Sequence, residues 1–193
     1  MPDYKCTNNY TGEVFACKPH DFCGKKDEIS YEVNYSHEES LRNWIVTFEL
    51  ECKPKYYLGF TGTCYFAGYI LSTFFVLPFS DYIGRKKIMM LAYYVHAAFL
   101  FFSLFLKGET GYQIFNLLNF MSGTAAAGYF LVAYYHTLES IEAKKTINAA
   151  SGIRAFVSLT SLFSALFFYF VSNDWKHLFI VVLVLLLGIT IVA

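Results

Sequence analysis

The sequence is poor in charged residues. Of its 193 residues, 16% are Asp, Glu, Lys or Arg, whereas 56% are hydrophobic and 20% are aromatic. This composition is too apolar for an ordinary soluble domain of this length, so a membrane protein is the first hypothesis. The 15 basic residues balance the 15 acidic ones, which leaves no basic footprint for nucleic acid, and no nucleic-acid partner is expected.

Charges are missing altogether from long stretches of the second part of the chain. Residues 57–79 contain no Asp, Glu, Lys or Arg, and a helix of about 23 residues covers a hydrocarbon core of roughly 30 Å. Four similar runs follow, and none alternates like a barrel strand, so we expect helices. The predicted fold class is an all-α integral membrane protein, with a transmembrane bundle over residues 57–193 and five spans at about 57–79, 88–106, 112–137, 152–171 and 177–193.

The first 56 residues form a separate, polar region that is rich in cysteine. An even number of cysteines in such a stretch is typical of disulfides, and three pairings are open. The four candidate disulfide cysteines are Cys6, Cys17, Cys23 and Cys52. A zinc site made by the first three of these and His20 is a rival interpretation, although the spacing is not a paired Cys-x2-Cys motif. Asn9 and Asn34 each begin a glycosylation acceptor tripeptide.

Positive charge is unevenly distributed among the short connections between the predicted spans. The first connection holds Arg85, Lys86 and Lys87, and the third holds Lys144 and Lys145, whereas the second and fourth have one lysine each. By the positive-inside rule the first and third connections are cytoplasmic. Residues 1–56 are therefore expected outside, as an extracellular or lumenal loop, and the plasma membrane is the expected location.

A dense charge cluster lies in the first connection, in the stretch PFSDYIGRKK of residues 78–87. Asp81 and Arg85 stand four residues apart and can pair on one helical face, while Gly84 permits a positive φ. An aspartate at the end of a span can also complement the N-terminus of a neighbouring helix. Such a contact can be made in one conformation and broken in another, which makes this cluster a candidate switch.

This stretch resembles the Gly-x-Leu-x-Asp-Arg-x-Gly-Arg-Lys motif that the major facilitator superfamily carries between its second and third helices. Asp81, Gly84, Arg85 and Lys86 match it. The cysteine-rich loop that closes with TFELEC is similar to that of the organic cation and anion transporter family, particularly its carnitine branch. Glu139 resembles the glutamate that opens that family's second cytoplasmic motif. The resemblance implies a gating role for these five residues.

The resemblance covers nearly the whole chain, from the external loop to the sixth helix of a twelve-helix fold. It implies that the sequence is a fragment, an incomplete N-terminal half. A helix ahead of Met1 would explain why the polar region has no apolar signal-peptide core before it. The expected partners are a small organic solute, the lipid bilayer, and a missing C-terminal bundle or a partner chain.

Few polar groups lie inside the predicted spans, and those few are candidates for a solute path. His96 is an ionisable group deep in a helix, which suits a proton relay or a ligand group, although a packing histidine is the commoner case. Asn116 and Asn119 need partners, which another helix or a solute can supply. Gly123 permits close helix packing, in a helix that lines the cavity in the resembled family. Tyr65 offers an aromatic face to a cationic solute.

Catalysis has no support in the sequence. It contains no Gly-x-Ser-x-Gly, no Walker-type loop and no His-Glu-x-x-His, so we expect no enzyme, no cofactor and no metal. The leading hypothesis is transport of organic ions or small organic solutes by alternating access, as part of a carrier. The alternative is a non-transporting accessory or degenerate membrane subunit, favoured because Leu77 and Asn119 replace a glycine and an arginine of the family. A third is a receptor-like protein that uses the cysteine-rich region for recognition.

Overall fold

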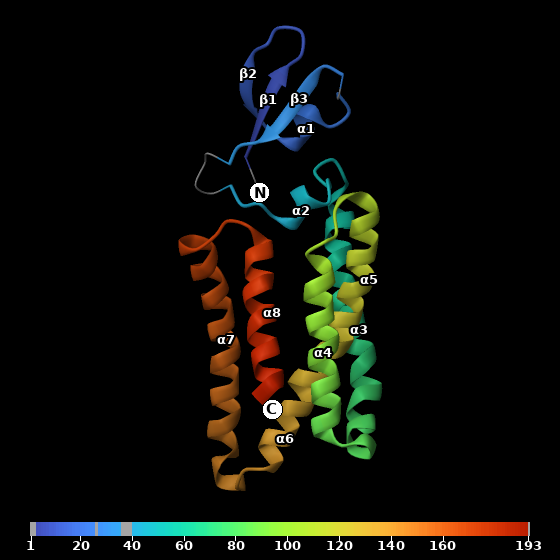
Figure 1. Cartoon of the computed structure of the whole chain (residues 1–193), viewed down its shortest axis with the longest axis vertical. Coiled ribbons are helices and arrows are strands. Elements are labelled where there is room, and N and C mark those ends of the chain that lie inside the picture. Colours follow the sequence, from blue (N-terminus) through green and yellow to red (C-terminus); the bar gives the residue numbers. More distant parts are fainter. Residues whose placement is uncertain (1–2, 26, 36–39, 193) are drawn as a thin grey trace.

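The computed structural model describes residues 3–25, 27–35 and 40–192 (Figure 1). A small N-terminal module, made by the described residues from 3 to 52, sits at one end of a set of long, nearly antiparallel helices. We call the opposite end of the helices, where α3 turns into α4, the distal end. The contacts that hold the helices to their neighbours at the module end differ in kind from those at the distal end.

The N-terminal module is built around an antiparallel sheet with the strand order β2-β1-β3. Its elements are β1 (Tyr4–Asn8), β2 (Val14–Cys17), α1 (Pro19–Phe22), β3 (Ile29–Val33) and α2 (Trp44–Thr47). The rings of Phe22 and Tyr31 stack with their centroids 4.0 Å apart, and Tyr4 packs against both. The all-α prediction is corrected for this module, because strands of four or five residues are too short to show a clear alternation in the sequence.

Two disulfides resolve the pairing that the sequence left open. Cys6 bonds to Cys17 between the adjacent strands β1 and β2, and Cys23 bonds to Cys52, just ahead of the first long helix. All four sulfurs are therefore oxidised, and the rival zinc site loses its thiolate ligands. A small module with so little apolar core depends on such bridges, which restrict the unfolded chain.

The helical part contains six α-helices among the described residues. They are α3 (Lys55–Ile83), α4 (Arg85–Ser103), α5 (Gly108–Ala126), α6 (Val132–Glu139), α7 (Thr146–Phe170) and α8 (Trp175–Val192). A π-helical segment, η1 (Ala127–Leu131), joins α5 to α6, and a short 3-10 helix, η2 (Ala143–Lys145), precedes α7. The third predicted span is thus one helical stretch interrupted by a wider turn.

Within the described residues, three helical stretches are long and apolar enough to cross a membrane: Lys55–Ile83, Gly108–Glu139 and Thr146–Phe170. Trp175–Gly188 is a shorter apolar helix. Helix α4 is not among these three, because it starts with three cations and stops at Ser103, so the span at residues 88–106 stays a prediction. Residues 88–103 rise only about 24 Å, less than the roughly 30 Å of a hydrocarbon core.

The helices α3 and α5 touch backbone to backbone. A Cβ added to Gly68 of α3 would lie 2.2 Å from the carbonyl oxygen of Phe120, and one added to Gly123 of α5 would lie 2.1 Å from that of Tyr65. Neither distance is compatible with a side chain, so each glycine makes room for the main chain of the other helix. This contact sets the spacing of the two helices.

The N-terminal module is attached to the helices by a buried aromatic cluster. Phe48, which follows α2, is fully buried against Tyr112 and Phe115 of α5 and against Trp175 of α8. The indole of Trp175 also donates a hydrogen bond of 3.0 Å to the hydroxyl of Thr47. Burial of several large aromatic side chains makes this junction a stable one.

Replacing Gly123 by alanine tests the contact between α3 and α5. We expect Gly123→Ala to lower the free energy of unfolding by about 1–3 kcal/mol, because the new methyl group overpacks the interface. Gly62→Ala, on α3 with nothing within 4 Å of the added Cβ, is the matched control and should be neutral or slightly stabilising. Thermal unfolding of the purified chain in detergent measures both. Equal stability of the two variants would contradict the close contact.

The half-buried carboxyl of Glu51 provides a pH test of the N-terminal module. Burial, with the nearby charge of Glu49, raises the pKa of Glu51 above its ordinary value. The folded module therefore binds this proton more tightly than the unfolded chain, and its stability should fall as pH rises from about 4.3 through the raised pKa. Glu51→Gln should remove this dependence and stabilise the module at neutral pH.

Hydrogen exchange of the β1 amides in the whole chain measures this effect, with variant and wild type compared at each pH. Glu32→Gln, at an exposed position of β3, is the control and should exchange like the wild type. A wild-type module that gained stability between pH 4 and pH 7 would refute the assignment.

Candidate functional site

The turn between α3 and α4 places the residues of the charge cluster. Gly84 has φ 101° and ψ 129°, a left-handed region that favours glycine, and its N–H donates to the carbonyl of Ser80 at 3.0 Å. Because α4 restarts immediately at Arg85, the guanidinium lies beside the preceding helical turn. Its Nη2 donates to Asp81 Oδ1 at 3.1 Å.

The same guanidinium also binds Glu139, the last residue of α6. Nη2 donates to Glu139 Oε1 at 2.9 Å, and Nη1 donates to Oε2, which makes a bidentate ion pair. The Arg85 side chain is 24% exposed, whereas those of Asp81 and Glu139 are 64% and 60% exposed. Arg85 thus lies between two solvated carboxylates and joins the distal ends of α3, α4 and α6. We call these three residues the Arg85 cluster.

Lys86 lies outside the Arg85 cluster although the sequence motif includes it. Lys86 and Lys87 are exposed, and neither has an ion pair among the residues that the structure describes. The motif residues therefore separate into two groups: Asp81, Gly84 and Arg85 shape the turn and its pairs, and the lysines present free charge at the distal end.

Three of the predicted path residues lie where α3 meets α5: Asn119, Gly123 and Tyr65. The amide of Asn119 donates to the carbonyl of Thr61 at 2.8 Å, and Gly123 packs on the main chain of Tyr65. Asn116, on the same helix, is 6% exposed, and its Oδ1 has no hydrogen-bond partner among the described residues. A buried amide oxygen without a partner is costly, so it marks a place where a water or a solute group can bind.

His96 belongs to a polar aromatic group that sequence reasoning found only in part. Its Nδ1 lies 2.8 Å from the hydroxyl of Ser122 on α5, and its ring meets that of Tyr129 edge-on at 5.4 Å. Tyr129 lies in η1 and stacks on Tyr93, with ring centroids 5.5 Å apart. The three-residue spacing of Tyr93 and His96, which puts them on one helical face, was the signal in the sequence for this group. No pattern in the sequence predicted the π-helical turn that positions Tyr129.

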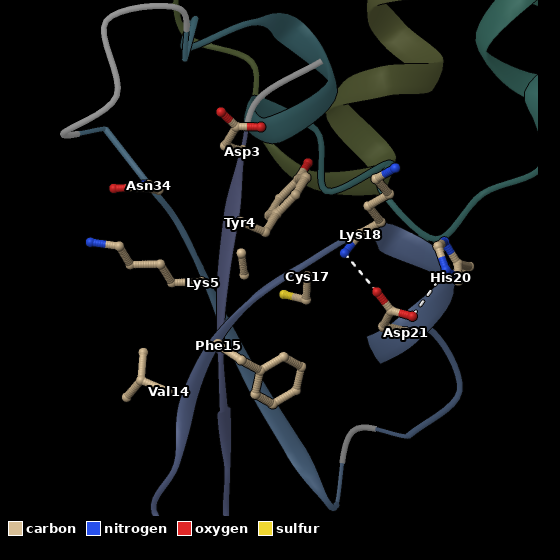
Figure 2. Close-up of a pocket in the computed structure, with 11 residues that line it drawn as sticks. Asp3, Tyr4, Lys5, Val14, Phe15, Cys17, Lys18, His20, Asp21 and Asn34 are labelled. Carbon is tan, nitrogen blue, oxygen red and sulfur yellow. Dashed lines mark hydrogen bonds and ion pairs between the residues drawn. The ribbon is translucent and has the colours of Figure 1, made fainter.

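A pocket of about 710 Å³ opens on the N-terminal module (Figure 2). Asp21 lies at one end, where it accepts a hydrogen bond from the N–H of Lys18 at 2.9 Å and pairs with His20 at 3.0 Å, and Lys5 and Phe15 line another part. Charges of both signs stand side by side on an exposed surface. The pocket therefore favours no single class of ligand.

The two predicted glycosylation acceptors are on this module as well. Asn9 is exposed in the turn after β1, and its side-chain amide donates to the carbonyl of Asp27 at 3.1 Å. Asn34 follows β3 directly, and the serine of its tripeptide, Ser36, lies outside the described residues. Glycosylation of both asparagines stays a prediction.

The helical part of the chain is the part that identifies its protein family. Residues 50–193 match the family model described as Major Facilitator Superfamily. The chain belongs to this superfamily. It is a family of transporters and not of enzymes, so the resemblance seen in the sequence is confirmed.

Relatives of this chain carry transporter names, and they are distant. Solute carrier family 22 member 21 of Mus musculus is 24% identical over 77% of this chain and 26% of its own length. An organic cation transporter-like protein of Drosophila melanogaster is 24% identical over 75% of this chain and 25% of its own length. An organic cation transporter protein of the same organism is 21% identical over 92% of this chain and 37% of its own. The chain thus spans about a quarter of the length of the first two relatives.

A double-mutant cycle tests the pair between Arg85 and Glu139. Because the pair is bidentate and joins α4 to α6, we expect Arg85→Gln and Glu139→Gln to destabilise the chain by less in combination than the sum of the single changes. The control cycle uses Glu142 and Lys145, an exposed pair at 3.2 Å within one short segment, and should show almost no coupling. Thermal unfolding in detergent at low salt measures both cycles, and additive effects in the first would count against the pair.

Proposed function

We propose that this chain is part of a carrier that moves organic ions or small organic solutes across a membrane by alternating access. Membership of the superfamily supports transport, and the organic cation transporter names of distant relatives support the solute class. The observation that carries the proposal is the Arg85 cluster. An ion-pair network that is largely exposed, yet joins three helix ends, can be broken and remade at modest cost.

The topology that we propose places residues 1–56 outside the cell and the distal end in the cytoplasm, with five spans in the plasma membrane. Disulfides form in oxidising compartments, and both of them lie in the N-terminal module. The cations of residues 85–87 and 144–145 lie in connections that the positive-inside rule assigns to the cytoplasm. In Figure 1 the α3–α4 turn is at the end opposite to the module.

In this proposal α3 and α5 move as one rigid body, because the glycine contact locks them together. The Arg85 cluster holds the distal ends of α3, α4 and α6 together in the conformation described here and releases them when its ion pairs break. Alternating access by rocking requires such a body, together with a second one that it can tilt against. The unpartnered Oδ1 of Asn116 and the group formed by His96, Ser122 and Tyr129 are the polar sites that a solute would meet.

An accessory or degenerate subunit is the second candidate function. The amide of Asn119, which stands where the family has an arginine, is engaged with the carbonyl of Thr61 between two helices. A side chain used for packing is not free to bind a charged solute. This observation favours a structural role for that position.

Uptake of radiolabelled tetraethylammonium into proteoliposomes tests the proposal when the chain is reconstituted together with the second helical bundle that rocking requires, supplied by a carrier of the same superfamily. We expect saturable uptake above that of empty liposomes, and we expect Asp81→Asn to reduce it without changing insertion, because one arm of the Arg85 cluster is lost. Glu142→Gln, outside the cluster, is the control and should leave uptake unchanged. A correctly inserted wild-type chain without uptake would favour the accessory subunit, and full uptake by Asp81→Asn would exclude the gating role.

A further inference from the structure

An apolar groove lies between α3 and α4 near the distal end. Its volume is about 260 Å³, and it is lined by Phe75 and Phe79 of α3, by Ile88, Leu91 and Val95 of α4, and by Ala125 of α5. Gly128 lines the groove without a side chain that would fill it. A Cβ added to Gly128 would lie 2.7 Å from the Cβ of Ala92. A narrow apolar groove of this kind fits a hydrocarbon chain.

A wider pocket adjoins the groove and is cationic. Its volume is about 840 Å³, and it shares Ile83 and Leu91 with the groove. Lys86, Lys87 and His136 also line it, and no acidic residue does. Arg85 lines the pocket too, but its charge is already balanced by the two carboxylates of the Arg85 cluster. The free positive charge of the pocket therefore comes from the two lysines.

We propose that the groove and the pocket together bind one anionic phospholipid, with an acyl chain between α3 and α4 and the phosphate on Lys86 and Lys87. A phospholipid joins acyl chains covalently to a negative headgroup, and the groove and the cationic pocket are continuous through Ile83 and Leu91. The lysines stand where α4 begins, which is the level of the headgroups for a helix that enters the membrane there. Basic pockets at the cytoplasmic ends of transmembrane helices bind anionic headgroups in this way.

The lipid site depends on the proposed topology in one respect only, which is the choice of membrane leaflet that the two lysines face. With the distal end in the cytoplasm, the lysines face the leaflet that is rich in phosphatidylserine and phosphoinositides. The bound phosphate would then lie one residue from Arg85, beside the ion pairs that join three helix ends. A lipid site at this place links membrane composition to the part of the molecule that we propose as a gate.

Native mass spectrometry of the purified chain, with phosphatidylserine or phosphatidylcholine added in detergent, tests this site. We expect the wild type to bind phosphatidylserine about tenfold more tightly than phosphatidylcholine. The double change Lys86→Gln and Lys87→Gln should abolish this preference. The matched control, Lys144→Gln with Lys145→Gln, removes two cations of another connection that do not line the pocket and should retain the preference.

A second variant tests the groove itself. Val95→Phe fills it and should weaken binding of both lipids, whereas Val157→Phe, at an exposed position of α7, should not. Glycerophosphoserine, which has no acyl chains, should bind far more weakly than phosphatidylserine. Equal affinity for these two would assign a simple anion site and overturn the proposal.

Two further results would also overturn the lipid site: a wild type without headgroup preference, and the same loss of preference in both lysine variants. The readout does not depend on solute movement. Failure of the lipid site would thus leave the transport proposal standing, and absence of uptake would leave the lipid site standing.

Discussion

The close approach of α3 and α5 is the constraint on which the rest of the helical part depends. Gly68 and Gly123 allow the two main chains to touch, and lipid offers little hydrophobic drive for helix association, so van der Waals contact of this kind is the main source of stability. Once the distance between α3 and α5 is set, the side-chain amide of Asn119 reaches the carbonyl of Thr61. Helix α5 also presents Ser122 to His96 of α4.

The two ends of the helices are held by interactions of different strength. At one end, a buried cluster around Phe48 and Trp175 attaches the N-terminal module, which two disulfides hold together internally, and this junction does not come apart without unfolding. At the distal end, the Arg85 cluster consists of charged groups in contact with water. Such pairs exchange readily with solvent. Motion is therefore easier at the distal end, with the other end acting as the fixed point.

The sequence predicted the features that depend on composition and local spacing. Charge-free runs placed the long helices, and the four-residue spacing of Asp81 and Arg85 placed their pair on one face. Glu139 lies 54 residues from Arg85, and only the family resemblance connected them. Disulfide pairing and the short strands of the N-terminal module depend on how the chain folds back on itself, which spacing does not encode. The π-helical turn likewise left no mark in a continuous apolar run.

That turn has a consequence for the whole helical stretch from Gly108 to Glu139. Residues 127–131 wind more loosely than an α-helix, and the side chains beyond them are rotated relative to those before. Upstream, Gly123 packs closely against α3, and downstream, Glu139 pairs with Arg85. Losing or gaining one residue between Gly123 and Glu139 would rotate the Glu139 carboxylate by about 100° around the helix axis. The length of this segment is thus as constrained as the chemistry at its ends.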